Sequence, residues 1–177
     1  LQFLLADSVR LIGTELKCQN LPDPECVSLD TKHILAWVKE NNPKTYVKNR
    51  FDKTQQPPGD PDCRLGCKRK HNRATPTTNP VSASTVAVGE FYWGYGSGIV
   101  VAKIPHRGEF VIAEMTQPFD HGDVTYFFPL MEQVEQRLGY RPRYGTFDAA
   151  FDAWYVYAHF YRENQPDFGF AAVPFSE

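Results

Sequence analysis

Two short stretches decide how this sequence folds, and each runs to an aspartate: Val27-Ser28-Leu29-Asp30-Thr31 and Tyr144-Gly145-Thr146-Phe147-Asp148. Both patterns predict β-strands. Successive side chains of a strand point to opposite faces, so Asp30 shares a face with Ser28, and Asp148 shares one with Thr146. If the two strands lie side by side in one sheet, the carboxylates meet at its edge. Paired carboxylates there are suited to hold divalent metal ions against a phosphodiester.

The composition predicts a globular chain with one sizeable core. The sequence has 177 residues, of which 42% are hydrophobic and 14% aromatic, and a chain of this length most often forms one domain. Disordered chains contain much less apolar material. No apolar run approaches the roughly 20 residues that cross a bilayer, so no membrane partner is expected.

The order of predicted elements favours a mixed α/β fold around a central sheet. Apolar residues at helical spacing predict a helix over 1–18 and another from Phe127 to Leu138, with Asp120 or Asp123 as its N-cap and Gly139 as its end. Strands are expected at about 25–31, 92–104, 109–115, 143–148 and 168–174. A helix carrying Phe151 and Trp154 is expected before the last strand.

The segment 39–90 differs from the rest of the chain in charge. It contains ten Lys/Arg and five Asp/Glu, a surplus of +5, whereas the whole chain has a net charge of −2. Its Pro-, Gln- and Asn-rich centre predicts a surface insertion, partly mobile, after the first strand. A basic insertion suits a polyanionic partner, and a solvated lysine-rich loop is the alternative.

The four cysteines are expected to be reduced, since no secretory signal precedes them. The spacing Cys63-x3-Cys67-x3-His71 is compatible with part of a zinc site, which Cys18 or Cys26 would complete. That spacing is looser than the two-residue gap of most zinc ribbons, which favours ordinary buried or loop cysteines.

Four motifs in order resemble those of bacterial insertion-sequence transposases of the DDE class. The first two are residues 27–32, similar to the family's first catalytic strand, and Trp93-Gly94-Tyr95-Gly96, similar to its glycine-aromatic second strand. The third, residues 119–123, sits where members carry a polar turn before a helix. The fourth, Phe147-Asp148-Ala149-Ala150-Phe151-Asp152, is similar to the segment around the second catalytic acid.

The resemblance spans most of residues 25–175, and it implies a ribonuclease H-like catalytic core. That core is a mixed five-stranded sheet flanked by helices, here with a long basic insertion after the first strand. On this reading residues 1–177 form a single partial catalytic domain. It contains an N-terminal helix (1–20), a first-strand region (25–38), the basic, loop-rich insertion (39–90) and the remainder of the core (91–177).

The implied activity is metal-dependent hydrolysis at transposon ends followed by strand transfer into target DNA. The implied cofactor is Mg²⁺, for which Mn²⁺ can substitute. In this reading Asp30 bridges two ions and Asp148 holds one, while Asp152 is a helix-surface acid. The implied setting is the bacterial cytoplasm, at the nucleoid, with a homodimer as a possible state.

The family's third acid has no secure counterpart, and Glu177 is the only candidate that follows the last predicted strand. The alternative is that the acid lies beyond a fragment, which would then be inactive or impaired. The candidates for DNA-phosphate contacts are Lys68, Arg69, Lys70 and Arg73. For Asp148 the competing interpretation is a helix N-cap.

Two further functions stay open at this stage. One is a stand-alone nuclease of the same fold. The other is a catalytically inactive remnant that binds DNA through residues 39–90. Metal binding separates the remnant from the two enzymes, and strand transfer separates the transposase from the nuclease.

Overall fold

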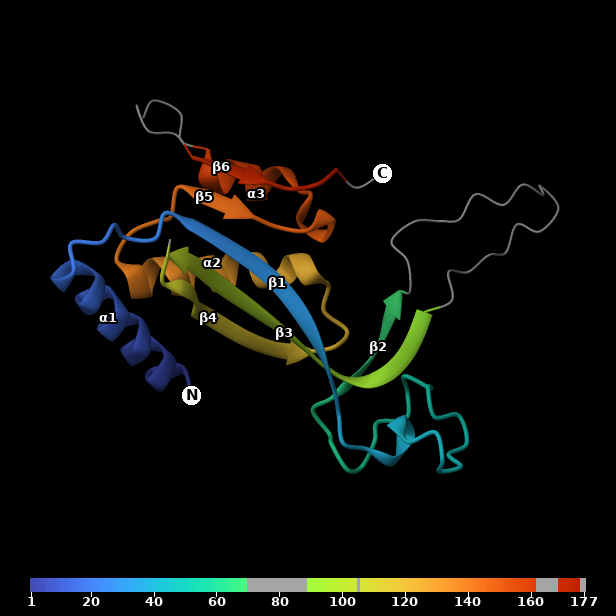
Figure 1. The fold of residues 1–177 in the computed structure, drawn as a ribbon. Coiled ribbons are helices and arrows are strands. Elements are labelled where there is room, and N and C mark those ends of the chain that lie inside the picture. Colours follow the sequence, from blue (N-terminus) through green and yellow to red (C-terminus); the bar gives the residue numbers. More distant parts are fainter. Residues whose placement is uncertain (70–88, 105, 162–168, 176–177) are drawn as a thin grey trace. The chain divides into compact units, whose positions relative to one another are not determined.

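The computed structural model describes residues 1–69, 89–104, 106–161 and 169–175. Their backbone forms an α/β fold built on a mixed sheet (Figure 1). The contacts divide the chain into two compact units. Unit 1 comprises Leu1–Lys32, Ser97–Thr116 and Gly122–Ser176, and unit 2 comprises His33–Gly96 and Gln117–His121.

The sheet has six strands in the order β2-β3-β1-β5-β6, and β4 also pairs with β3. The strands are β1 (Cys26–Leu35), β2 (Arg64–Arg69), β3 (Gly89–Ile104), β4 (Gly108–Pro118), β5 (Tyr144–Thr146) and β6 (Phe170–Ala172). The pairs β1–β5 and β5–β6 are parallel, and β2–β3 is antiparallel. The sequence predicted five strands, and the additional one is β2, which lies inside the segment expected to be loop-rich.

Three α-helices belong to unit 1: α1 (Gln2–Cys18), α2 (Phe127–Leu138) and α3 (Trp154–Phe160). Helix α1 packs against α2, and α3 packs against β6 (Figure 1). The predicted end of α2 is confirmed, since Gly139 takes the left-handed conformation with φ of 79°, which glycine adopts without steric cost. None of the described helices is long and apolar enough to cross a membrane.

Short 3₁₀ turns precede the helices at two places where the sequence predicted otherwise. Turn η2 (Asp123–Tyr126) leads into α2, so the residue at the N-cap is Tyr126 and the predicted Asp cap is wrong. Turn η3 (Ala149–Phe151) is separated from α3, so Phe151 is not part of that helix.

The core of unit 1 lies between the helices and the sheet. Phe127, which is fully buried, makes ring contacts with Phe147, His159 and Phe160 among others. Val27 and Leu29 of β1 are part of this core, and they lie on the face of the strand opposite to Ser28 and Asp30. Strand alternation therefore directs the apolar residues inward and leaves the polar ones at the surface, as the sequence predicted.

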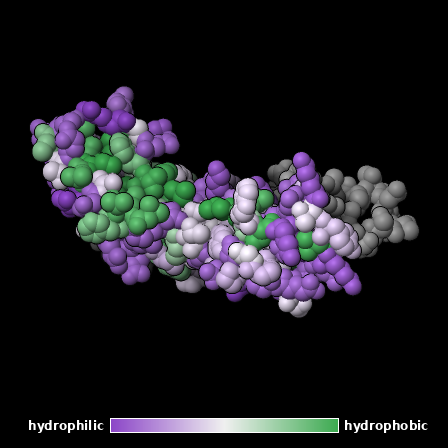
Figure 2. All heavy atoms as spheres, turned by 90° about the horizontal axis from the view of Figure 1, so that it is seen from below, coloured by the Kyte–Doolittle hydropathy of each residue, from purple (hydrophilic) through white to green (hydrophobic). Residues whose placement is uncertain are grey.

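Part of α1 faces solvent with large apolar side chains. Leu1, Phe3, Leu4 and Leu11 are all exposed, and apolar side chains gather over α1 at the left of Figure 2. The buried side chains of this helix are Val9 and Leu16, which are seven residues apart and so lie on one face of the helix, in agreement with the helical spacing of apolar residues.

Unit 2 has a small core of its own. Ala36, Val38, Cys63, Leu65 and Trp93 are buried together. The side-chain amide of Asn41, in the 3₁₀ turn η1 (Lys39–Asn41), accepts from the Trp93 backbone N–H at 2.9 Å and donates to the Trp93 carbonyl at 2.7 Å. The part of the expected insertion that the structure describes is therefore packed around a buried core.

Candidate functional site

The two aspartate-bearing segments are neighbours in the sheet. Strands β1 and β5 pair in parallel, with Ser28 opposite Thr146, and the two hydroxyls share a hydrogen bond of 2.5 Å. Asp30 and Asp148 each follow that pair by two residues. Because parallel strands run in the same direction, the two acids come at the same end of the pair, as predicted from the sequence.

Asp148 lies just after β5 and accepts the Ala150 N–H through Oδ1 at 3.0 Å. It therefore caps η3, which agrees with the competing interpretation of this residue as a cap, although the capped element is a 3₁₀ turn. Partial burial is the main cause that raises its pKa, and the negative charges of Asp123 and Asp30 raise it further, while the Ala150 N–H acts in the opposite direction. The negative charges of Asp123 and Asp30 therefore disfavour the ionised form of Asp148.

Asp30 is exposed on β1, and its Oδ1 accepts the N–H of the next residue, Thr31, at 2.8 Å. The Thr31 hydroxyl donates to Asp123 Oδ1, also at 2.8 Å. Thr31 therefore joins β1 to η2, and Asp123 is brought into the same electrostatic neighbourhood as Asp148.

Asp123 is the residue of this site that sequence reasoning missed. The sequence predicted it as a helix cap and as part of the polar turn 119–123, because an Asp a few residues before an apolar helical pattern usually caps the helix. In the structure its side chain bonds with Thr31 across 92 residues of sequence. The sequence signal that could have found it is its position between a strand and the following helix, which is also the position of Asp148.

The carboxylate oxygens of Asp30 and Asp148 are ligands that suit a hard cation. Each uses Oδ1 for a backbone N–H, and no described residue donates to Oδ2 of either. Mg²⁺ is commonly held by one or two carboxylates, with water and substrate phosphate completing its shell. Among the described residues, however, no group of three or more His, Cys, Asp or Glu side chains is placed to hold a metal ion.

The thiols are not gathered in the described part of the chain. All four cysteines are free; Cys63 is buried in unit 2 and Cys67 is exposed. Burial raises the pKa of the Cys63 thiol, and the charge of Asp60 adds to this, so the neutral thiol is favoured. The third member of the possible zinc motif, His71, lies outside the described residues.

The predicted DNA-contacting residues are described only in part. Lys68 is exposed on β2, opposite Glu90 of β3, and the backbone of Arg69 ends β2. Lys70, Arg73 and the candidate third acid Glu177 lie outside the described residues. Lys68 belongs to unit 2, whereas the three aspartates belong to unit 1.

Asp152 was predicted to be a helix-surface acid, and it lies between η3 and α3. Its Oδ1 accepts from the Tyr157 hydroxyl at 2.9 Å. This bond to α3 gives Asp152 a structural role, which makes it a suitable control residue for the other acids.

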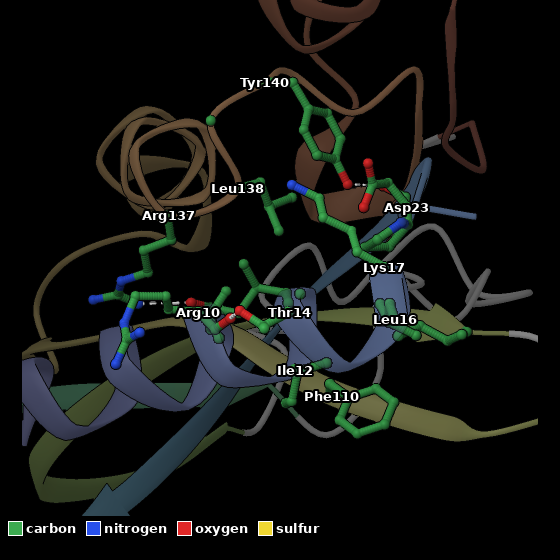
Figure 3. A pocket seen from close by; sticks show the side chains of 16 residues that line it. Arg10, Ile12, Thr14, Leu16, Lys17, Asp23, Phe110, Arg137, Leu138 and Tyr140 are labelled. Atoms are coloured by element: carbon green, nitrogen blue, oxygen red, sulfur yellow. Dashed lines mark hydrogen bonds between the residues drawn. The ribbon is translucent and has the colours of Figure 1, made fainter. Parts of the chain in front are cut away.

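Unit 1 also contains a cavity of about 390 Å³ between α1 and the C-terminal end of α2. Arg10, Lys17, Arg137 and Tyr140 are among its lining residues (Figure 3). Tyr140 donates to the Pro24 carbonyl at 2.8 Å, and Arg137 donates to the Ile112 carbonyl at 2.7 Å. These bonds tie the cavity wall together, and none of the three aspartates lines it.

The sequence and the structure were compared with known proteins. No protein-family model, no curated protein and no solved structure matches the chain.

Proposed function

We propose that this chain is the catalytic core of a DDE-type DNA transposase with a ribonuclease H-like fold. One observation carries the proposal: the parallel pairing of β1 with β5 brings Asp30 and Asp148 to the same end of two neighbouring strands. The charge of Asp30 also contributes to the raised pKa of Asp148, after burial and the charge of Asp123, which agrees with the placement of both acids at one end of the strand pair.

The order of the strands gives further support. Strand β1 lies between β3 and β5, and β4 pairs with β3 on the far side. Without β2, this leaves five strands in a mixed sheet, with the first strand at its centre. A mixed five-stranded sheet flanked by helices is what the sequence motifs imply.

Asp30 and Asp148 would hold the divalent ions. When bound, two such ions neutralise the phosphate and activate the attacking oxygen. The chain's own contribution is orientation. The backbone N–H groups of Thr31 and Ala150 fix Oδ1 of the two acids, which leaves Oδ2 of each free of described donors.

The reaction is an in-line displacement at phosphorus. For hydrolysis, a water oxygen forms a bond to phosphorus, the bond to the leaving 3′ oxygen breaks, and that oxygen is released as a hydroxyl. For strand transfer, the new 3′-hydroxyl oxygen forms a bond to the phosphorus of a target phosphodiester. The bond from that phosphorus to the target's 3′ oxygen breaks, and this oxygen leaves as a 3′-hydroxyl after taking up the proton that the attacking hydroxyl gives up. The third acid that the family uses is not placed, since Glu177 lies outside the described residues.

A catalytically inactive DNA-binding remnant is the second candidate. The specific observation in its favour is that no group of three or more potential ligands is placed to hold a metal among the described residues. Both candidates predict binding to DNA, and they differ in metal binding.

Calorimetric titration of the full chain with Mn²⁺ tests the proposal, with Asp30→Asn, Asp148→Asn and the control Asp152→Asn. Asn preserves the shape and the Oδ1 acceptor but removes the charge. We expect Asp30→Asn and Asp148→Asn each to weaken binding at least tenfold and Asp152→Asn to leave it within twofold, because Tyr157 already bonds Asp152. Circular dichroism checks that each variant folds.

Undetectable Mn²⁺ binding by the wild type would favour the remnant and overturn the proposal. Equal binding by all four proteins would place the metal elsewhere and also overturn it. Where binding follows the expected pattern, supercoiled plasmid DNA and a labelled oligonucleotide with a free 3′-hydroxyl are added with Mn²⁺. Joining of the label to the plasmid supports a transposase, whereas nicking alone supports a nuclease.

A further inference from the structure

The chain that leaves β1 in unit 2 presents a fully exposed tryptophan. From residue 35 to residue 40 exposed and buried side chains alternate: Leu35, Trp37 and Lys39 face solvent, and Ala36, Val38 and Glu40 are buried. The relative exposure of Trp37 is 101%. We call the three exposed residues the Trp37 surface.

The backbone beneath the Trp37 surface is held on both sides of the tryptophan. The Ala36 N–H donates to the Trp93 carbonyl at 3.0 Å, and the Asn41 side-chain amide donates to the Ala36 carbonyl at 2.8 Å. Ala36 and Val38 are both part of the buried core of unit 2. Exposure of Trp37 is therefore fixed by its packed neighbours.

A hollow of about 520 Å³ adjoins this surface, and Trp37, Lys39 and Asn42 are among its lining residues. No described residue bonds to or stacks on the Trp37 ring. Arg50 donates to the Asn42 carbonyl at 3.1 Å, which brings a second cation close to the hollow beside Lys39. An unpartnered aromatic face thus stands next to positive charge.

The segment that carries this hollow differs in charge from the whole chain. Residues 33–69 contain eight Lys/Arg and four Asp/Glu, a surplus of +4, in a chain whose net charge is −2. An exposed apolar surface in neutral surroundings is typical of a protein contact, whereas aromatic rings among cations are typical of nucleic-acid binding.

We propose that the Trp37 surface binds single-stranded DNA by stacking an unpaired base on Trp37 while Lys39 contacts a neighbouring phosphate. The faces of a base are open to a side chain only when the base is out of its stack, so this surface selects unpaired strands over duplex. This proposal rests on the proposed function in one respect, which is the choice of DNA as the polyanion that binds. Its test requires neither metal nor cleavage.

Fluorescence anisotropy with a labelled 20-nucleotide oligothymidine tests the proposal, in EDTA at 50 mM salt. Stacking of one base on an aromatic side chain corresponds to about a 5- to 150-fold change in Kd, so we expect Trp37→Ala to weaken binding by a factor in that range. Trp37→Phe should recover part of the loss because it keeps a stacking ring. Lys39→Ala should lower the slope of log K against log salt by about 0.7.

The chain offers a matched control in Trp154, an exposed tryptophan of unit 1 with a relative exposure of 78%. Trp154→Ala should leave the Kd within twofold of the wild type, and both alanine variants should unfold at the wild-type temperature because neither ring is buried.

Any one of four results would overturn the proposal. The first is a Kd of Trp37→Ala within twofold of wild type, and the second is an equal loss in Trp154→Ala. The third is binding to a 20-nucleotide oligouridine that is tenfold tighter than to oligothymidine, which would assign the surface to RNA. Sedimentation velocity without DNA tests a second copy as the occupant: a dimer that Trp37→Ala dissociates, with DNA binding unchanged, would also refute it. Failure of Mn²⁺ binding at the aspartates leaves all these readouts intact, so the two proposals fail separately.

Discussion

Replacing Gly145 with alanine should destabilise unit 1 next to the candidate site. Gly145 is the central residue of β5, in register with Val27 of β1 and Ala171 of β6. A Cβ atom there would lie 2.4 Å from Cε2 of Phe147 and 2.5 Å from Cζ of Phe160. Carbon atoms pack best at about 3.5–4.0 Å, so both rings would have to retreat by roughly 1 Å.

The rings have little room to move. Phe160 is 1% exposed and Phe147 7% exposed, and both touch Phe127 in the core. Overpacking of this kind costs about 1–3 kcal/mol of unfolding free energy. For a chain of this size that corresponds to a Tm about 2–12 °C lower. Phe147 immediately precedes Asp148, so we also expect Mn²⁺ to bind more weakly to Gly145→Ala.

Thermal unfolding followed by circular dichroism measures the effect, and Gly13→Ala is its control. Gly13 lies inside α1, and a Cβ there would meet nothing within 4 Å. Alanine is favoured over glycine inside a helix by about 0.5–1 kcal/mol, so the control should unfold at a slightly higher temperature. A Gly145→Ala protein as stable as the wild type, beside a control that behaves as expected, would refute the packing argument.

Three further substitutions test other contacts. Asp148→Asn should raise the Tm at pH 7 by an amount worth less than about 1 kcal/mol, as expected of an exposed site. Burial and like charges raise the pKa of this carboxyl, so its ionised form opposes folding. The gain in Tm from Asp148→Asn should therefore vanish once the pH is low enough to protonate the carboxyl in both the folded and the unfolded protein. A gain in Tm that persists at pH 3 in calorimetry would contradict this. Gly94→Ala would place a Cβ 2.1 Å from the Ile34 carbonyl oxygen. Because backbone cannot swing aside, we expect the variant to unfold at a lower urea concentration than the wild type, as followed by intrinsic tryptophan fluorescence; an unchanged urea midpoint would refute this. Tyr95→Phe removes the 2.6 Å bond to Asp60, the main cause that lowers the pKa of that carboxyl, so the variant should be less stable by about 1 kcal/mol at pH 7, with a difference that shrinks in acid; equal urea midpoints at pH 7 would contradict the assignment.

The strand pairing at the candidate site could be predicted because its pattern is local. Apolar and polar residues alternate from Val27 to Asp30 and again from Thr146 to Asp148, so each segment fits a strand with one buried face. Helix α1 and the end of α2 at Gly139 were predicted for the same reason, since helical periodicity and a C-terminal glycine are short-range signals.

Strand β2 and the role of Asp123 could not be predicted, because both depend on contacts distant in sequence. Strand β2 runs from Arg64 to Arg69 and has one large aliphatic residue, Leu65, so nothing local marks it as a strand. It forms by pairing with β3. Asp123 bonds with Thr31 only after β1 and η2 have been brought together, and its position before a helix favoured the simpler prediction of a cap.

The parallel pairing at the candidate site has a consequence for how the protein is made. Ser28 and Thr146 are separated by 118 positions, and a ribosome adding about 5–20 residues per second needs roughly 6–24 s to cover that distance. During this interval the edge of β1 that later receives β5 has no partner, and unpaired edges promote aggregation. Non-local pairing of this kind also slows refolding, so the acidic pair should be among the last features to assemble, and recovery of folded protein should depend on chaperones that shield β1.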